Sequence, residues 1–158
     1  MPRYQIFYAR RPTFHPSGAF GVPRLTVAAM HSTHVRLCEV EADSLVMAFR
    51  VNALGPLLVA KAFEPLLKRS RQARFASLSA RVGSIGDNRL GGWYAYRASK
   101  AAQNMLTRSM AIELGRGSRP VTLISLHPGT VDTDLSRPFQ RNVPDRKLFS
   151  TGRAVGQL

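Results

Sequence analysis

The chain reads YRASK from Tyr96 to Lys100. Residues four apart share one face of a helix, so the phenol of Tyr96 and the ammonium of Lys100 lie side by side if this segment is helical. A neighbouring cation favours phenolate and lowers the pKa of a tyrosine toward neutrality. The pair therefore predicts a proton donor, and the alternative is a solvated helix face on which the spacing has no function.

The segments around this pair predict a strand, a helix and a second strand. Residues 74–79 are a short β-rich run, residues 93–114 have the length and end signals of a helix, and residues 121–126 are another β-rich run. With these lengths the strands are parallel and joined by a crossover, and functional groups collect at their carboxyl ends. The groups expected on one rim are Ser79, Tyr96 and residues 128–133.

A further helix is predicted for residues 41–68. Its first turn is acidic and carries cap-forming residues, Glu41-Ala42-Asp43-Ser44. Pro56 is expected to kink this helix, because a proline frees carbonyl groups in the turn before it. Asn52 lies in that turn and is expected to join a water or side-chain network, and the alternative is an exposed position on the helix surface.

Together these segments resemble the catalytic half of the short-chain dehydrogenases/reductases. The resemblance is carried by a mid-helix Asn motif at Val51 to Gly55, a Ser-bearing strand and turn at Phe75 to Gly83, the YxxxK motif at Tyr96 to Lys100, and a PGxxxT segment at Pro128 to Thr133. Residues 80–100 most resemble the C-factor branch of the family, which has a similar long loop before its tyrosine. The match covers about residues 34–152.

The resemblance implies an α/β fold with a Rossmann-like doubly wound parallel sheet, of which residues 34–158 form a partial domain. The family cradles the dinucleotide phosphates on a glycine-rich turn, because glycine lets a helix N-terminus approach the pyrophosphate. The sequence has no such turn, and its nearest candidate, residues 17–21, follows two prolines and is interpreted as a loop. We therefore expect an incomplete fold in which the N-terminal dinucleotide-binding βαβ unit is missing.

The chemistry implied by the resemblance is hydride transfer between a nicotinamide and a small carbonyl or alcohol substrate. Tyr96 would donate the proton, Lys100 would lower the pKa of Tyr96 and hold the ribose, and Asn52 would anchor the water that returns the proton. The cofactor is expected to be NAD or NADP, with NADP favoured by the resemblance. The residues expected to hold it are Tyr96, Lys100, Pro128, Gly129, Val131 and Thr133.

The serine position departs from the family pattern. Family members usually have two serines at the end of this strand, and the second, which polarises the substrate carbonyl, stands about three residues before the glycine of the turn. Counted back from Gly83, that place is Ala80. Ser79 is the expected replacement, although alternation along a strand could turn it away from the substrate, and Ser84 is a second candidate.

Composition bounds the class of protein. The formal net charge is +14, but arginines are scattered from Arg3 to Arg153 without a basic stripe, so no nucleic-acid partner is expected. Hydrophobic residues make up 44% of the chain, no apolar run approaches the roughly 18 residues that cross a bilayer, and no membrane role is expected. The single Cys38 excludes an internal disulfide, and no metal site is predicted. His127 is expected to pack at a strand end rather than bind a metal.

Residues 1–33 form a separate basic segment with several prolines and glycines, and it is left unassigned. It could be disordered, and it could be an organellar transit segment, because such segments are rich in arginine and poor in acidic residues. The interpretation we favour is a sequence unrelated to the fold. The expected location is then cytoplasmic, with an organelle as the alternative.

Two functions follow from these observations. The first is an NAD(P)-dependent reductase of the short-chain family, with impaired activity in this chain because the phosphate turn is missing. The second is a non-catalytic interaction module in which the helices at residues 41–68 and 93–114 pair with a partner, such as a second copy of the chain. The Tyr96 and Lys100 pair favours the first, and the missing turn favours the second.

Overall fold

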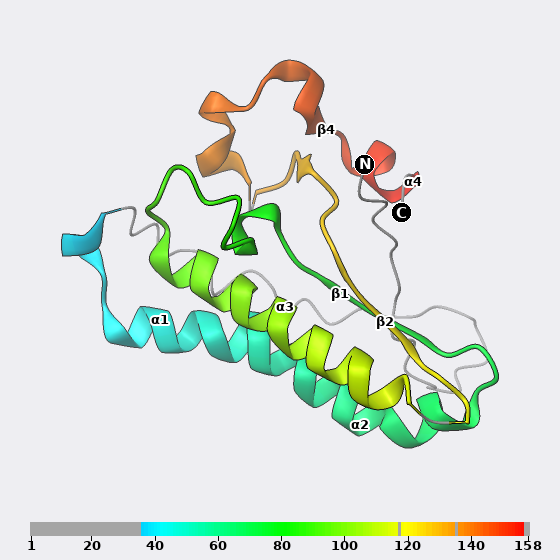
Figure 1. The fold of residues 1–158 in the computed structure, drawn as a ribbon. Coiled ribbons are helices and arrows are strands. Elements are labelled where there is room, and N and C mark those ends of the chain that lie inside the picture. The colour runs from blue at the N-terminus through cyan, green and yellow to red at the C-terminus, as the bar shows by residue number, and fades with distance from the viewer. Residues whose placement is uncertain (1–35, 117, 135, 157–158) are drawn as a thin grey trace.

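The computed structural model describes residues 36–116, 118–134 and 136–156 (Figure 1). The unassigned segment 1–33, the transit-segment alternative and the run at residues 17–21 lie outside this described part. The first described element is a single 3-10 turn, Leu37–Glu39. The described part therefore contains no dinucleotide-binding βαβ unit ahead of the first long helix.

The centre of the fold is a parallel two-stranded sheet. Strand β1 (Arg74–Leu78) pairs with β2 (Thr122–Leu126) in register from Arg74 opposite Thr122 to Leu78 opposite Leu126. Helix α3 (Tyr94–Leu114) connects the two strands and runs alongside them (Figure 1). The strand, helix and strand predicted from the sequence are confirmed, each within one residue of its expected bounds.

The predicted helix at residues 41–68 is one continuous helix with an irregular middle. It consists of α1 (Ala42–Phe49), a π-helical segment (Arg50–Leu54) and α2 (Gly55–Arg69). The backbone N–H of Gly55 donates to the carbonyl oxygen of Arg50, five residues earlier. Pro56 has no N–H to offer the preceding turn, and the helix widens immediately before it. The expected irregularity therefore takes the form of a π-helical turn.

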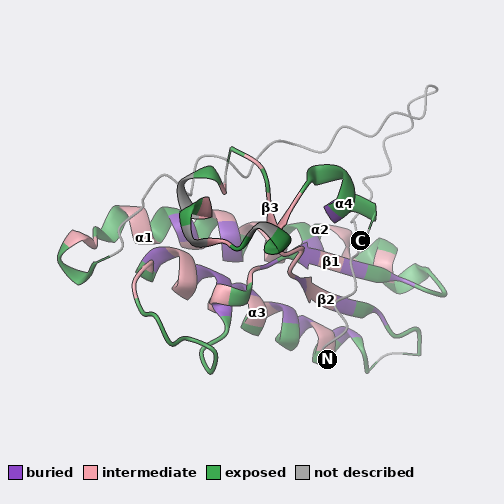
Figure 2. Ribbon diagram, turned by 90° about the horizontal axis from the view of Figure 1, so that it is seen from above, coloured by how far each residue is buried: buried purple, intermediate pink, exposed green. Residues whose placement is uncertain are grey.

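The core lies between the sheet and the helices, which cover one face of it (Figure 2). Phe75 is 2% exposed, and the side chains at alternate positions of β1 face the helices, as the two-residue period of a strand requires. The cluster consists of Ala60, Ala73, Phe75, Met110, Leu114, Val121 and Leu123. This packing fixes the last turns of α3 against the amino-terminal halves of both strands.

The last described segments form a small group of short elements, drawn above the sheet in Figure 1. Strand β3 (Thr130–Val131) pairs in parallel with β4 (Leu148–Phe149). Short 3-10 segments, Arg137–Asn142 and Asp145–Lys147, lie between these strands, and helix α4 (Thr151–Gly156) follows.

The helix over residues 42–69 corrects one expectation. It contains an 18-residue window with mean hydropathy 1.4, so by length and composition alone it is apolar enough to cross a membrane. Its inner face nevertheless packs in the protein, where Ala48, Ala53 and Ala60 are each 1% exposed. A core helix of a soluble protein passes the same test of length and composition, so the finding is weak support for a membrane role.

Candidate active site

Tyr96 and Lys100 lie on one face of the first two turns of α3. The turn before the helix is tight, with φ of +64° at Gly91 and Gly92 and of +46° at Trp93. Arg97 fastens this turn, because its Nε donates to the carbonyl of Gly91 over 3.1 Å. The ammonium of Lys100 lies 5.9 Å from the ring centroid of Tyr96. The predicted juxtaposition of phenol and ammonium is present.

The electrostatics of this pair differ from the expectation. Burial raises the pKa of Tyr96 above its ordinary value, and burial lowers the pKa of Lys100 to about 8. The prediction that Lys100 draws the pKa of Tyr96 down is wrong for this structure. The reason is geometric, because the ammonium lies beside the ring and donates to the carbonyl of Leu78 over 2.9 Å. Desolvation of the phenolate is then the dominant influence.

Asn52 is buried in the π-helical segment, with 5% of its surface exposed. Its Nδ2 donates to Oγ of Ser99 over 3.0 Å, and that hydroxyl donates to the backbone carbonyl of Tyr96 over 3.0 Å. The predicted side-chain network is therefore confirmed, and the exposed alternative is wrong. Through Ser99, Asn52 is tied to the turn that carries Tyr96.

Ser79 follows directly after β1 and extends the sheet by one hydrogen bond, from its N–H to the carbonyl of Leu126. Its Oγ donates to Oδ1 of Asn104 over 2.7 Å, so the hydroxyl faces α3. Ala80, at the place of the family serine, has an extended backbone with φ of −145° and ψ of 150°. Because successive side chains of an extended backbone alternate, the Cβ of Ala80 points away from the direction of Ser79.

A cavity of about 280 Å³ lies at the carboxyl ends of the strands. It is lined by Ser79, Ala80, Arg81, Ser84, Asp87, Asn104, Ser125, Leu126 and His127. Both serine candidates are in this lining, whereas Tyr96 and Lys100 are not. The cavity therefore takes in the serine part of the predicted rim, and Lys100 reaches the neighbouring carbonyl of Leu78.

His127 lies at the end of β2 and is half-buried, which agrees with a packed strand-end residue. Burial, and next the positive charge of Arg81, lower the pKa of His127 below its ordinary value. The imidazole is then neutral at pH 7. No group of three potential metal ligands occurs among the described residues.

The Pro128–Thr133 segment makes a turn that only glycine permits at residue 129. Gly129 has φ of +83°, and a Cβ there would lie 2.6 Å from Cε2 of Phe149. The guanidinium of Arg153 lies over the ring of Phe149, 4.4 Å from the ring centroid. The turn therefore lets the Phe149 ring close over the backbone of residue 129.

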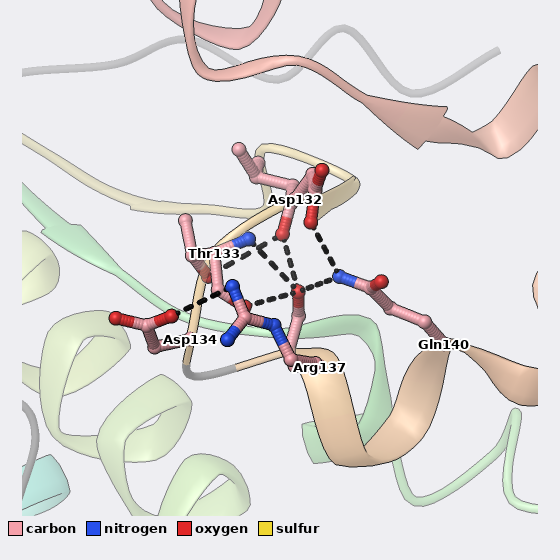
Figure 3. A network of polar contacts seen from close by, with 7 residues as sticks. Asp132, Thr133, Asp134, Arg137 and Gln140 are labelled. Carbon is pink, nitrogen blue, oxygen red and sulfur yellow. Dashed lines mark hydrogen bonds and ion pairs between the residues drawn. The ribbon is translucent and has the colours of Figure 1, made fainter.

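Thr133 and Gln140 lie in a polar network (Figure 3). Ser136 is at its centre and also contacts Val131. The N–H of Asp132 donates to the carbonyl of Phe149 in β4, so the N–H of Val131 points to the opposite edge of β3, since successive N–H groups of a strand alternate. Oγ of Ser136 donates to the carbonyl of Val131 and accepts from the N–H of Thr133 over 3.3 Å. Nε2 of Gln140 donates to this hydroxyl over 2.8 Å.

Three polar residues that hold the site were not predicted, namely Gln103, Asn104 and Ser136. Gln103 and Asn104 stand three and four residues after Lys100, and polar residues at this spacing extend the same helix face. That spacing is a signal from which both residues could have been found. Ser136 stands three residues after Thr133 beyond a tight turn, and no periodic signal marks it.

Comparison with known proteins gives one family. The family model described as short chain dehydrogenase matches residues 25–144. The chain is 45% identical over 102 residues to C-signal of Myxococcus xanthus, which covers 65% of this chain and 60% of that protein. It is 41% identical over 97 residues to 1-hydroxy-2-glutathionyl-2-methyl-3-butene dehydrogenase of Rhodococcus sp., covering 61% of this chain and 41% of that one.

Solved structures give the same result. The carbonyl reductase Sniffer of D. melanogaster has a TM-score of 0.67 at 29% identity, over 78% of this chain and 50% of that one. An NADPH-bound carbonyl reductase from chicken fatty liver has a TM-score of 0.65 at 28% identity, over 80% and 53%. The chain thus spans about half the length of these relatives.

Proposed function

The chain belongs to the short-chain dehydrogenase family, and from this premise we propose that it transfers hydride between a nicotinamide dinucleotide and a carbonyl or alcohol substrate. Its fold is the Rossmann-like α/β fold expected from the sequence, and its similarity to C-signal agrees with the C-factor branch. The observation that carries the proposal is the Tyr96 and Lys100 pair on α3, tied through Ser99 to the buried Asn52.

In this proposal Tyr96 is the proton donor for carbonyl reduction. Burial keeps its pKa above the ordinary value, so the phenol holds its proton at neutral pH and can give it to an alkoxide that forms beside it. Binding of a cationic nicotinamide, or a turn of Lys100 toward the phenol oxygen, would lower that pKa for the reverse reaction. The role of Asn52 is to anchor the water that returns the proton.

The residues proposed to hold the cofactor lie on both sides of the site. Lys100 would donate to the ribose hydroxyls, and the outward N–H of Val131 together with Thr133 would orient the carboxamide of the nicotinamide. The turn at Pro128 and Gly129 would let the chain approach the nicotinamide ring. We propose NADP rather than NAD, because the chicken reductase and a Burkholderia multivorans reductase of 34% identity are bound to NADPH and NADP.

Ser79 is proposed to polarise the substrate carbonyl, with Ser84 as the second candidate. Its hydroxyl now donates to Asn104, so it must turn from that partner to reach a substrate beside Tyr96. This requirement, together with alanine at position 80, supports a slow enzyme rather than an efficient one.

The alternative function is an interaction module, and one observation favours it. Large apolar side chains are exposed on α1, α2 and α3, including Leu58 at 59% and Met105 at 66%. Exposed apolar surface of this kind, where it is contiguous, marks a site of protein interaction.

NADPH-dependent reduction of a panel of small aldehydes and ketones, with Tyr94→Phe as the matched control for Tyr96→Phe, tests the proposal. Tyr94 is 39% exposed and stands two residues earlier on α3. Turnover that Tyr96→Phe abolishes and Tyr94→Phe preserves supports the reductase. Turnover that is the same in both variants contradicts the mechanism. A chain that neither binds NADPH nor turns over, but forms dimers, supports the interaction module.

A further inference from the structure

Gln103 lies one turn beyond Lys100 on α3 and is 1% exposed. Resting on the proposed function, we propose that Gln103 is a positioning residue, which holds the ammonium of Lys100 at the carboxyl end of β1 and sets the direction of its remaining N–H bond. The role belongs to this chain's own side chains and is separate from the four residues predicted to be catalytic.

Three polar groups close a triangle at this point. Nζ of Lys100 donates to Oε1 of Gln103 over 2.9 Å and to the carbonyl of Leu78 over 2.9 Å. Nε2 of Gln103 donates to the same carbonyl over 2.9 Å. Both side chains are therefore fixed by each other and by the last residue of β1.

The triangle determines what the ammonium can do. An ammonium has three N–H donors, and here two are used, which leaves one whose direction the other two define. With the Leu78 carbonyl alone, Nζ could swing about a single hydrogen bond. Gln103 removes that freedom, and a fixed donor loses less entropy when it binds a ribose hydroxyl or a phenolate.

Burial makes an acceptor at Gln103 necessary. Lys100 is 8% exposed, and burial alone accounts for the direction in which its pKa departs from that of an ordinary lysine. The two acceptors oppose desolvation by favouring the charged form. An amide does this without forming an ion pair, so the positive charge of Lys100 stays available to a cofactor or a phenolate.

The competing explanation is that Gln103 serves only the Leu78 carbonyl and that Lys100 merely lies nearby. Two variants separate the explanations. Gln103→Met keeps the length of the side chain but removes both the acceptor and the donor. Gln103→Glu keeps an acceptor for Lys100 and removes the donor to Leu78.

The experiment follows the Nζ chemical shift of Lys100 in the full chain labelled with ¹³C,¹⁵N-lysine, from about pH 6 to about pH 11. The other lysines are Lys61, Lys68 and Lys147, and the Lys100→Met spectrum assigns the signal. The matched control is Thr107→Val on the same helix as Gln103. It removes a buried hydroxyl, which lies 3.4 Å from the hydroxyl of Ser77 in β1.

We expect Gln103→Met to lower the pKa of Lys100 by about one pH unit, Gln103→Glu to raise it above the unsubstituted value, and Thr107→Val to leave it unchanged. An unchanged titration in Gln103→Met, or a pKa lowered by Gln103→Glu, overturns the positioning role. If Gln103→Met does not fold, Gln103→Asn decides, because it keeps the amide but shortens the side chain so that its oxygen no longer reaches Nζ of Lys100. A lowered pKa of Lys100 in Gln103→Asn supports the positioning role, and an unchanged pKa overturns it.

This test is independent of turnover. The titration is recorded without substrate or cofactor, so an inactive chain still shows whether Gln103 holds Lys100. Absence of Tyr96-dependent turnover contradicts the proposed function, whereas a titration of Lys100 that ignores Gln103 contradicts the positioning role. The two failures are therefore observed separately.

Discussion

The side-chain amide of Asn52 donates to the hydroxyl of Ser99 over 3.0 Å, and this bond joins the π-helical segment to the helix that carries Tyr96. Ser99 is fully buried, and its hydroxyl in turn donates to the carbonyl of Tyr96. The position of Tyr96 thus depends on a residue 44 places earlier in the chain.

Asn52→Ala is expected to destabilise the chain by about 1 to 2 kcal/mol, because a buried hydroxyl loses its donor and a small cavity is left. Urea unfolding followed by circular dichroism measures the change. Asn88→Ala is the control, since Asn88 is exposed and its side chain accepts one bond from Gly91. Equal losses in the two variants would contradict the structural role of Asn52.

Tyr96→Phe is expected to reduce carbonyl turnover by roughly 10² to 10⁴ while the melting temperature stays within a degree or two of the original. Only a hydroxyl is removed, and no hydrogen bond from that hydroxyl is found within the described part of the chain. Steady-state rates with NADPH and thermal melting provide the two readouts. A variant with near-normal turnover would refute Tyr96 as the acid.

Gly129→Ala is expected to destabilise the Pro-Gly turn by about 1 to 3 kcal/mol, because alanine at φ of +83° is strained and its Cβ meets the ring of Phe149. Gly86→Ala is the control, since no atom lies within 4 Å of a Cβ at Gly86. Adding Phe149→Leu to Gly129→Ala should restore the part of the loss that is due to the clash. Thermal unfolding of the unsubstituted chain and the three variants separates the backbone strain at residue 129 from the steric clash with Phe149.

Stability is expected to rise with pH between about pH 8 and pH 10. The folded pKa of Lys100 is about 8, below the ordinary value of 10.5, so the unfolded chain binds more protons across this interval. Stability from this group is then lost as pH falls through the interval, by on the order of 2 kcal/mol. Above about pH 10 the raised pKa of Tyr96 acts in the opposite direction.

Chemical denaturation across this pH range checks the prediction. Lys100→Met should flatten the slope, and Lys147→Met, which changes an exposed lysine, should leave it intact. A slope that persists in Lys100→Met would assign the effect to another group.

Met105→Glu and Leu58→Glu are expected to weaken self-association, because each places a charge among the exposed apolar side chains of the long helices. Sedimentation velocity over a range of concentrations measures the change. Ile85→Glu is the control, since Ile85 is 85% exposed in a loop before α3. If all three variants weaken association equally, the association is non-specific and does not use a helix interface.

Much of this fold follows from the sequence, because it depends on local patterns. The apolar period and the end signals of α3 place that helix within one residue, and the β-rich runs place both strands. The pairing of Tyr96 with Lys100 follows from helix geometry alone. The family motifs add the Pro-Gly turn and the position of Asn52.

The remainder depends on contacts that no local pattern encodes. The direction of the pKa shift of Tyr96 depends on where Nζ of Lys100 points. Nζ donates to the carbonyl of Leu78, which is 22 residues from Lys100 in the sequence. The partner of Ser79 is likewise set by how α3 packs on β1. Roles in catalysis and cofactor binding stay predictions for all the site residues.

The π-helical turn at Arg50–Leu54 absorbs one residue without changing the phase of the long helix. A π turn contains about one more residue than an α turn but completes the same full rotation. Deleting a single residue there would therefore relax the turn to α-helix and leave α1 and α2 in phase. The same deletion inside α1 or α2 would rotate one part of the helix against the other by about 100°. Related sequences are thus expected to tolerate a change of length by one residue at this segment and not elsewhere in the helix.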